Sequence, residues 1–231
     1  MTVHRVERDS DVPFVAAITH VMYGTACHDV TTPDGLWDIV IQRHAGKITV
    51  LQTGLITKPI ALDYLEGDEY LSISFKPGVF MPRLPGARMV DTAVVRPLTT
   101  GRTFALDSDE LEIPSFENAE GLVERLVKRD IIVRDEIVAE VAEGGSKVLS
   151  ARSVQRHFVH ALGLSPKQLA QIQRAKRAVA LLRAGRAVVV VAMDLGYADQ
   201  PHMTRSLKRF IGRTPGEISS SGREHHPTEH L

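Results

Sequence analysis

Two groups of arginine, glutamine and histidine side chains in the last third of the chain have the chemistry needed to read DNA. The first group is Arg152, Gln155 and Arg156, and the second group is Gln200, His202 and Arg205. An arginine can donate two hydrogen bonds to one guanine, and a glutamine pairs with adenine in the same bidentate way. Phosphates accept half or more of the hydrogen bonds between proteins and DNA, so about half of these residues are expected to grip the backbone without specifying a sequence. We assign the basic residues that follow to the phosphates: Lys208, Arg209 and Arg213.

The distribution of charge supports this reading of the last third. The whole chain has 28 basic and 28 acidic residues, yet residues 146–223 hold 14 Lys and Arg against 3 Asp and Glu. The rest of the chain is correspondingly acidic. A basic segment beside an acidic one is typical of a DNA-binding part joined to a partner part. An ordinary solvated basic surface is the alternative, and we favour it less because both groups of candidate readers lie in this segment.

A pair of helices is predicted to position the second group, over residues 188–211. The first helix must end near Gly196, which is expected to adopt the left-handed conformation that glycine tolerates. Asp199 can cap the second helix, and Pro201 falls in its first turn, where a missing N–H costs little. Three apolar residues recur at steps of four and three and form one buried face, with the candidate readers elsewhere: Met203, Leu207 and Phe210.

The first group lies on another predicted helix, which begins after Ser150 and ends at Gly163. A long helix then runs from Ser165-Pro166 to about Gly185. At 1.5 Å per residue this connector is roughly 30 Å long, and one turn of DNA is about 34 Å. Two reading helices at its ends could therefore enter successive major grooves.

The segment from Ser150 to Pro215 resembles the C-terminal DNA-binding domain of the AraC/XylS family of transcription regulators. The matching residues, in order, are Ser150, Gln155-Arg156, Phe158, Gly163, Ser165-Pro166, Arg174, Ala178, Leu181-Leu182, Val191-Ala192, Gly196-Tyr197, Asp199, His202, Arg205, Lys208-Arg209, Gly212 and Thr214-Pro215. The resemblance implies seven helices that hold two helix-turn-helix motifs on a linker helix. It also implies a bacterial-type transcription factor in the cytoplasm that binds double-stranded DNA, with RNA polymerase as a partner if it is an activator; repression stays open.

The sequence departs from the family pattern at three places. Met203 stands where the family usually has an aromatic residue, and Leu207 replaces a common phenylalanine. Both changes keep a buried apolar side chain. Residues 144–149, which lead into the first reading helix, are unusual, so the helix before them is the least well defined part of the match.

The N-terminal part has the texture of a β-rich domain, more distantly similar to the small β domain of some of these regulators. Turns near residues 45 and 67 predict two hairpins, the first from 36–42 with 47–52 and the second from 60–65 with 70–75. Short strands at this spacing favour a barrel or sandwich. In the family such domains sense effectors or form homodimers. An apolar pocket lined by Trp37 and Phe75 is one possible effector site, and ordinary core packing is the alternative.

We therefore expect an α+β multidomain chain with a β-barrel or sandwich-like domain followed by an all-α domain. Its parts are a β-rich sensor or dimerisation domain (1–112), a helical connector (113–145), the double helix-turn-helix domain (146–218) and a polar tail (219–231). The connector helices, near 115–130 and 134–142, either join the domains, pair two subunits or pack against the β domain.

Other chemistry is poorly supported by the sequence. His20, His28 and His44 lack the spacing of a cupin-type metal site, and the histidines after residue 224 form only a polar tail. Cys27 is the single cysteine, so no intrachain disulfide forms, which fits a reducing compartment. We expect no signal peptide and no membrane span, because the sequence has no early apolar run and no apolar stretch of about 18 residues. It has no phosphate-binding glycine loop, and we expect no cofactor. A β-barrel enzyme tethered to DNA and an architectural DNA protein remain the alternatives.

Overall fold

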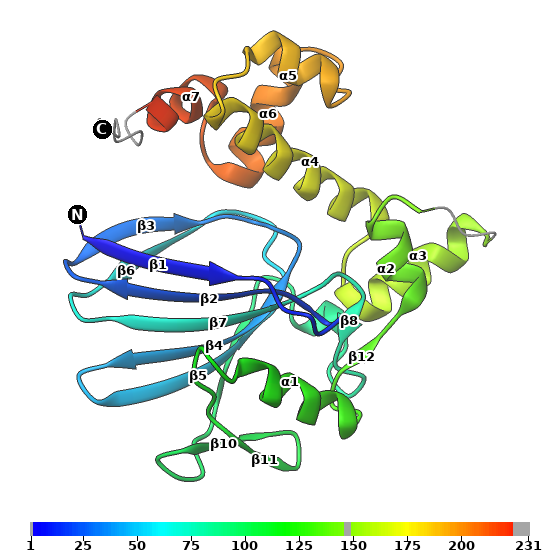
Figure 1. Cartoon of the computed structure of the whole chain (residues 1–231). Helices are drawn as coiled ribbons and strands as arrows, with labels where there is room; N and C mark the ends of the chain where they lie inside the picture. The colour runs from blue at the N-terminus through cyan, green and yellow to red at the C-terminus, as the bar shows by residue number, and fades with distance from the viewer. Residues whose placement is uncertain (1, 146–148, 224–231) are drawn as a thin grey trace.

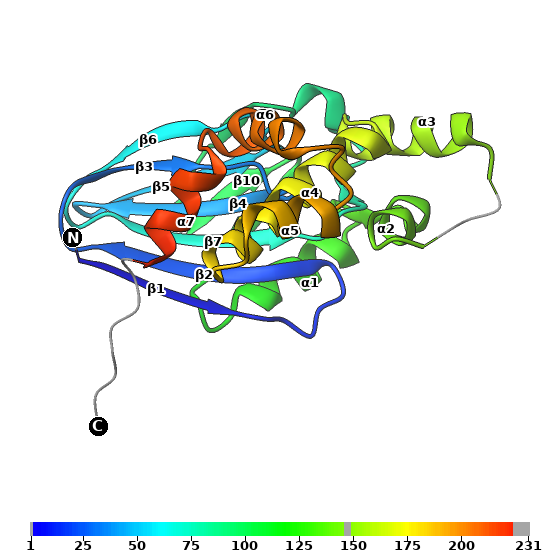
Figure 2. The ribbon, with the colours of Figure 1, turned by 90° about the horizontal axis from the view of Figure 1, so that it is seen from above.

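The computed structural model describes residues 2–145 and 149–223, with the side chains of 221–223 left aside. Strands of the N-terminal region form the lower part of the molecule, and the C-terminal helices lie above one face of its main sheet (Figure 1). Viewed from above, the last four helices overlie the central strands (Figure 2). One continuous hydrophobic core runs from the strands into the helices, from Val15 to Ile218.

The strands and the short 3-10 helix η1 have the following bounds: β1 (Val3–Arg8), β2 (Val15–Tyr23), β3 (Cys27–Thr31), β4 (Trp37–His44), β5 (Lys47–Thr53), β6 (Ile60–Tyr64), β7 (Glu69–Phe75), β8 (Val79–Phe80), η1 (Gly86–Arg88), β9 (Ala93–Arg96), β10 (Thr103–Leu106), β11 (Asp109–Glu112) and β12 (Val133–Arg134). The helices are α1 (Ala119–Lys128), α2 (Glu136–Ala142), α3 (Ala151–Leu162), α4 (Pro166–Arg183), α5 (Val188–Asp194), α6 (Gln200–Ile211) and α7 (Pro215–Arg223).

The main sheet is six-stranded and open, with the order β1-β2-β7-β4-β5-β9. Its edge strands, β1 and β9, do not pair with each other, so the described residues form no closed barrel and the barrel named in the prediction is not found. Three two-stranded ladders accompany the sheet: β3-β6, β8-β12 and β10-β11. The predicted mixture of a β-rich N-terminal region and a helical C-terminal region is confirmed.

The first predicted hairpin is confirmed, because β4 pairs with β5 across the turn at Ala45 and Gly46. The second predicted hairpin, which pairs residues 60–65 with 70–75, is wrong. A turn does form, with the Asp68 N–H donating to the Leu65 carbonyl at 3.1 Å, but β6 pairs with β3 while β7 lies between β2 and β4. Leu71, Ile73 and Phe75 of β7 are each 1% exposed or less, so this strand takes a central place that the largely exposed β6 could not fill.

Helix α1 covers the face of the sheet that is turned away from the C-terminal helices (Figure 1). Leu122, Val123 and Leu126 are fully buried in the common core. Arg8 on β1 is hydrogen-bonded to both carboxylate oxygens of Glu120, and its guanidinium lies 5.0 Å from the Phe116 ring centre. Of the three roles considered for the connector, α1 therefore packs against the β region of its own chain.

The predicted helix ends of the C-terminal region are confirmed by their caps. The Ser150 hydroxyl accepts a hydrogen bond from the Ser153 N–H, and Ser165 forms a capping box with Gln168 at the start of α4. Gly163 ends α3 in the left-handed conformation, at φ +72°. Helix α4 has 18 residues and is about 27 Å long at 1.5 Å per residue.

Candidate nucleic-acid interface

Helices α5 and α6 form a helix-turn-helix unit joined by residues 195–199. Gly196 has φ +67°, which matches the predicted left-handed turn. The Asp199 carboxylate accepts a 2.6 Å hydrogen bond from the His202 N–H and so caps α6. The inward face of α6 is fully or almost fully buried, as predicted: Met203, Leu207 and Phe210. The opposite face of α6 is left free to meet a ligand.

The turn of this unit is held by Arg174, which reaches it from the middle of α4. The Arg174 guanidinium donates to the Gly196 carbonyl at 3.3 Å and lies 4.4 Å from the centre of the Tyr197 ring. Tyr197 is only 6% exposed. Sequence reasoning placed Arg174 in the family pattern but assigned it no role, since nothing local shows which turn a side chain on α4 will reach.

The three candidate readers of α6 differ in their surroundings. Gln200 and Arg205 are exposed, whereas His202 is partly buried. The Nδ1 atom of His202 accepts a 3.3 Å hydrogen bond from the Ala198 N–H, and its ring packs edge-on to Tyr197 at 5.4 Å. His202 therefore braces the turn in addition to any part it takes in binding DNA.

The basic residues assigned to phosphates lie along and beyond the second half of α6. Lys208, Arg209 and Arg213 are all exposed. The Arg209 guanidinium is 4.9 Å from the ring centre of Phe210, so part of this side chain is committed to covering the core. Lys208 is the better candidate for a simple electrostatic contact.

The first group of readers lies on the outer side of α3. Arg152, Gln155 and Arg156 are exposed, and with Ser150, Ser153 and Val159 they line one open hollow on the surface. Within the part of the chain that the structure describes, no salt bridge ties either arginine to a carboxylate. Neither arginine is therefore neutralised by an acidic neighbour among these residues.

The helix before α3 is not joined to it by a tight turn. Eight residues, 143–150, separate α2 from α3, and three of them lie outside the described residues. A helix-turn-helix usually has a turn of about 3–4 residues. Asp135 links the two helices, because it caps α2 through the Ile137 and Val138 N–H groups while its other oxygen lies 2.7 Å from His157 Nδ1.

Helix α3 and the α5–α6 unit lie at different places along α4. Both views place α2 and α3 near its N-terminal end and α5 to α7 towards its C-terminal end (Figures 1 and 2). The chain thus brings two exposed groups of Arg and Gln side chains onto two helices that both pack against α4, which is about 27 Å long. Such groups are suited to base edges and phosphates.

Comparison with known proteins agrees with this geometry. A family model described as a helix-turn-helix domain matches residues 148–221. The C-terminal region is an AraC-type helix-turn-helix domain. This AraC-type domain starts just before α3 and runs through α7, and it identifies a DNA-binding regulator of transcription. No curated protein and no solved structure shows significant similarity to the chain.

The described residues contain neither a metal-binding cluster nor a membrane-spanning helix. In residues 2–145 and 149–223, no group of three or more His, Cys, Asp or Glu side chains is arranged to hold a metal ion. The tail histidines lie outside these residues. None of the described helices is both long and apolar enough to span a membrane.

Proposed function

We propose that this chain is a sequence-specific regulator that reads two adjacent major grooves, one with α3 and one with α6. The observation that carries the proposal is the placement of two exposed Arg and Gln groups on two separate helices, α3 and α6, that both pack against α4. The length of α4, about 27 Å, is close to one DNA turn of about 34 Å. Successive grooves on one side of the duplex are therefore within reach of both helices.

The residues that contact bases in this proposal are Arg152, Gln155 and Arg156 on α3 and Gln200, His202 and Arg205 on α6. Lys208 and Arg209 contact phosphates. Exposure supports these roles for every residue except His202, which is partly buried and would have to reach DNA from its place against Tyr197. Regulation of transcription then proceeds through contact with RNA polymerase if the chain is an activator.

The β region, residues 1–112 of the proposed division, has the role of sensing an effector or of forming a homodimer. Trp37 and Phe75 do not make a pocket between them, because their rings stack at 4.1 Å and both are buried. The indole N–H of Trp37 donates to the Val79 carbonyl at 2.7 Å. These two residues are core, and an effector site would have to lie elsewhere in the region.

Selection from random DNA duplexes tests the proposed function. The full chain is expected to enrich a bipartite sequence whose two halves lie about one helical turn, 10–10.5 base pairs, apart. Binding to the enriched duplex should exceed binding to scrambled DNA by about 10³-fold or more at a stated salt concentration. Enrichment of a single undivided half-site, or no enrichment, contradicts reading by two helices.

A further inference from the structure

The C-terminal end of α3 meets η1 of the β region backbone to backbone. A Cβ atom added at Gly86 would lie 2.5 Å from the Ala161 carbonyl oxygen and 2.6 Å from the Gly163 nitrogen. In the other direction, a Cβ at Gly163 would lie 2.7 Å from the nitrogen and Cα of Ala87. Because real side chains do not approach backbone atoms so closely, this contact requires glycine on both sides.

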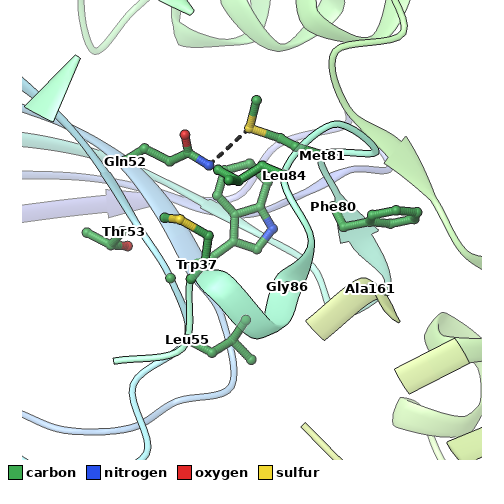
Figure 3. A pocket seen from close by; sticks show the side chains of 11 residues that line it. Trp37, Gln52, Thr53, Leu55, Phe80, Met81, Leu84, Gly86 and Ala161 are labelled. Carbon is green, nitrogen blue, oxygen red and sulfur yellow. Dashed lines mark hydrogen bonds between the residues drawn. The ribbon is translucent and has the colours of Figure 1, made fainter. Parts of the chain in front are cut away.

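Side chains around these glycines insert α3 into the β region. Phe158 and Leu162 are 1% exposed, and the ring of His160 packs edge-on to Phe80 of β8 at 5.3 Å. Ala161 lines a small cavity whose other walls, including Trp37, belong to the β region (Figure 3). The cavity has about 20 Å³, room for a single water molecule, so the joint is close to fully packed.

The helix before α3 is fixed to the same part of the β region. Strand β12 pairs with β8, and the Asp135 N–H donates to the Gly78 carbonyl at 2.8 Å. A Cβ at Gly78 would lie 3.1 Å from the Ala139 Cβ. Helix α2, which is linked to α3 by Asp135 and His157, is thus itself fixed to the β region, and η1 contacts α3 beside it.

The second unit is attached to the β region far more lightly. At the end of α6, a Cβ added at Gly212 would be 3.4 Å from Pro59, an ordinary contact distance. No backbone-to-backbone approach like that of Gly86 and Gly163 is found between α6 and the strands in the described residues. The position of α3 relative to α6 is thus set jointly by α4 and by η1.

We propose that Gly86 and Gly163 are positioning residues for DNA recognition: η1 packs against α3 beside α2 and fixes α3 at the distance from α6 that one operator spacing requires. This rests on the two-groove function proposed above. A shift of η1 by a few tenths of an ångström would turn or displace α3 as a body, since the end of the helix has no room to yield. The β region is then part of the reading device and sets which half-site spacing is bound.

The experiment compares the full chain with its Gly86→Ala variant on duplexes that differ only in the number of base pairs between the two half-sites selected by the wild type. Gly101→Ala is the matched control, because a Cβ at Gly101 meets no atom within 4 Å. We expect Gly86→Ala to lose about tenfold or more in affinity at the best spacing, as the base contacts of α3 fall out of register. Its affinity for a duplex with the α6 half-site alone should stay within about twofold of the wild type.

A shifted or flattened spacing profile in Gly86→Ala, with the wild-type profile in Gly101→Ala, supports the proposal; an unchanged profile in a folded Gly86→Ala overturns it. If Gly86→Ala does not fold, the same spacing experiment is made with Val90→Ala. Val90 Cγ2 packs against Gly163, so its removal loosens the contact between η1 and α3 without a clash. A folded Val90→Ala with a broader profile supports positioning, and one with the wild-type profile overturns it. A wild-type chain with no spacing preference overturns the two-groove function itself, which is a separate result because it is seen before any variant is made.

Discussion

The two units that carry the predicted DNA contacts are held in place by different parts of the chain. Helix α6 is supported by α5, by the turn at Gly196 and by Arg174 from α4, all within the AraC-type domain. Helix α3 is supported by α2 and also by η1 and β8, which lie more than sixty residues earlier in the sequence. One reading unit is therefore self-contained, whereas the other is completed by the β region.

This difference determines how a change in the β region reaches DNA. A displacement of η1 acts on α3 directly through touching backbones, whereas among the described residues it reaches α6 by way of α4 and through the light contact at Pro59. A domain that senses an effector or a partner has the largest influence on DNA binding if it is joined rigidly to one reading helix and not to the other. Its movement then changes the position of α3 relative to α6.

The largest effect is expected on stability, from alanine substitutions at two glycines with the same backbone conformation. Gly163 and Gly196 have φ values of +72° and +67°, so alanine at either position costs about 1–2 kcal/mol in backbone strain. Only at Gly163 would the new Cβ also meet backbone atoms, which adds about 1–3 kcal/mol of overpacking. Chemical denaturation of the full chain should show a free energy of unfolding that falls by more in Gly163→Ala than in Gly196→Ala. Equal losses would mean that α3 is not fixed against η1.

The next effect concerns base reading by each unit. Arg205→Ala should weaken binding by about 1–3 kcal/mol and relax the preference at one base pair of the α6 half-site. Arg156→Ala should do the same in the α3 half-site. Affinities on a panel of single-base operator variants measure both, with the exposed Arg102 of the β region replaced by alanine as the control. Weakening that is uniform over the panel would assign the arginine to a phosphate.

A third effect concerns Asp38, a buried carboxyl of β4 that lies near α4. Burial, aided by the charge of Asp34, raises the pKa of Asp38 to about 6, while Lys176 on α4 acts in the opposite direction. A carboxyl whose pKa is higher in the folded than in the unfolded chain stabilises the fold most at low pH. That contribution is lost as the pH rises from about 4 through 6.

Asp38→Asn removes this dependence. Relative to the wild type, the variant should gain about 1–3 kcal/mol in free energy of unfolding between pH 4 and pH 8. Asp9→Asn is the control, since Asp9 is an exposed carboxylate of the β region. If the free energy of unfolding changes with pH in parallel in the wild type and in Asp38→Asn, the pKa of Asp38 is not raised by folding. The spacing preference on DNA should not move in either variant, because neither touches η1.

The sequence predicted the helices well because their ends are local features. Ser150, Ser165 and Asp199 cap helices whatever lies around them, and the left-handed glycines end helices in the same way. The apolar repeat on α6 likewise gave its buried and exposed faces, and hence the exposure of Gln200 and Arg205.

What the sequence did not predict depends on distant partners. The turn before β7 was visible, but the choice of β3 as the partner of β6 rests on competition among all the strands for the buried centre of the sheet. The brace that Arg174 provides, the edge-on packing of His202 and the meeting of Gly86 with Gly163 all join residues from separate elements. No periodicity or motif encodes such contacts.

The smallest effect comes from a phosphate contact on the self-contained unit. Lys208→Ala should weaken binding to all sequences alike and reduce the slope of log affinity against log salt by about 1. Lys208 is a cleaner choice than Arg209, whose guanidinium also covers Phe210. Salt titrations measure this slope, with Lys58→Ala, an exposed position of the β region, as the control. If α6 is positioned independently of η1, the same change in slope must appear when Lys208→Ala is combined with Gly86→Ala. A different change in the double variant would show that the β region reaches both reading helices, and the contrast between the two units would then fail.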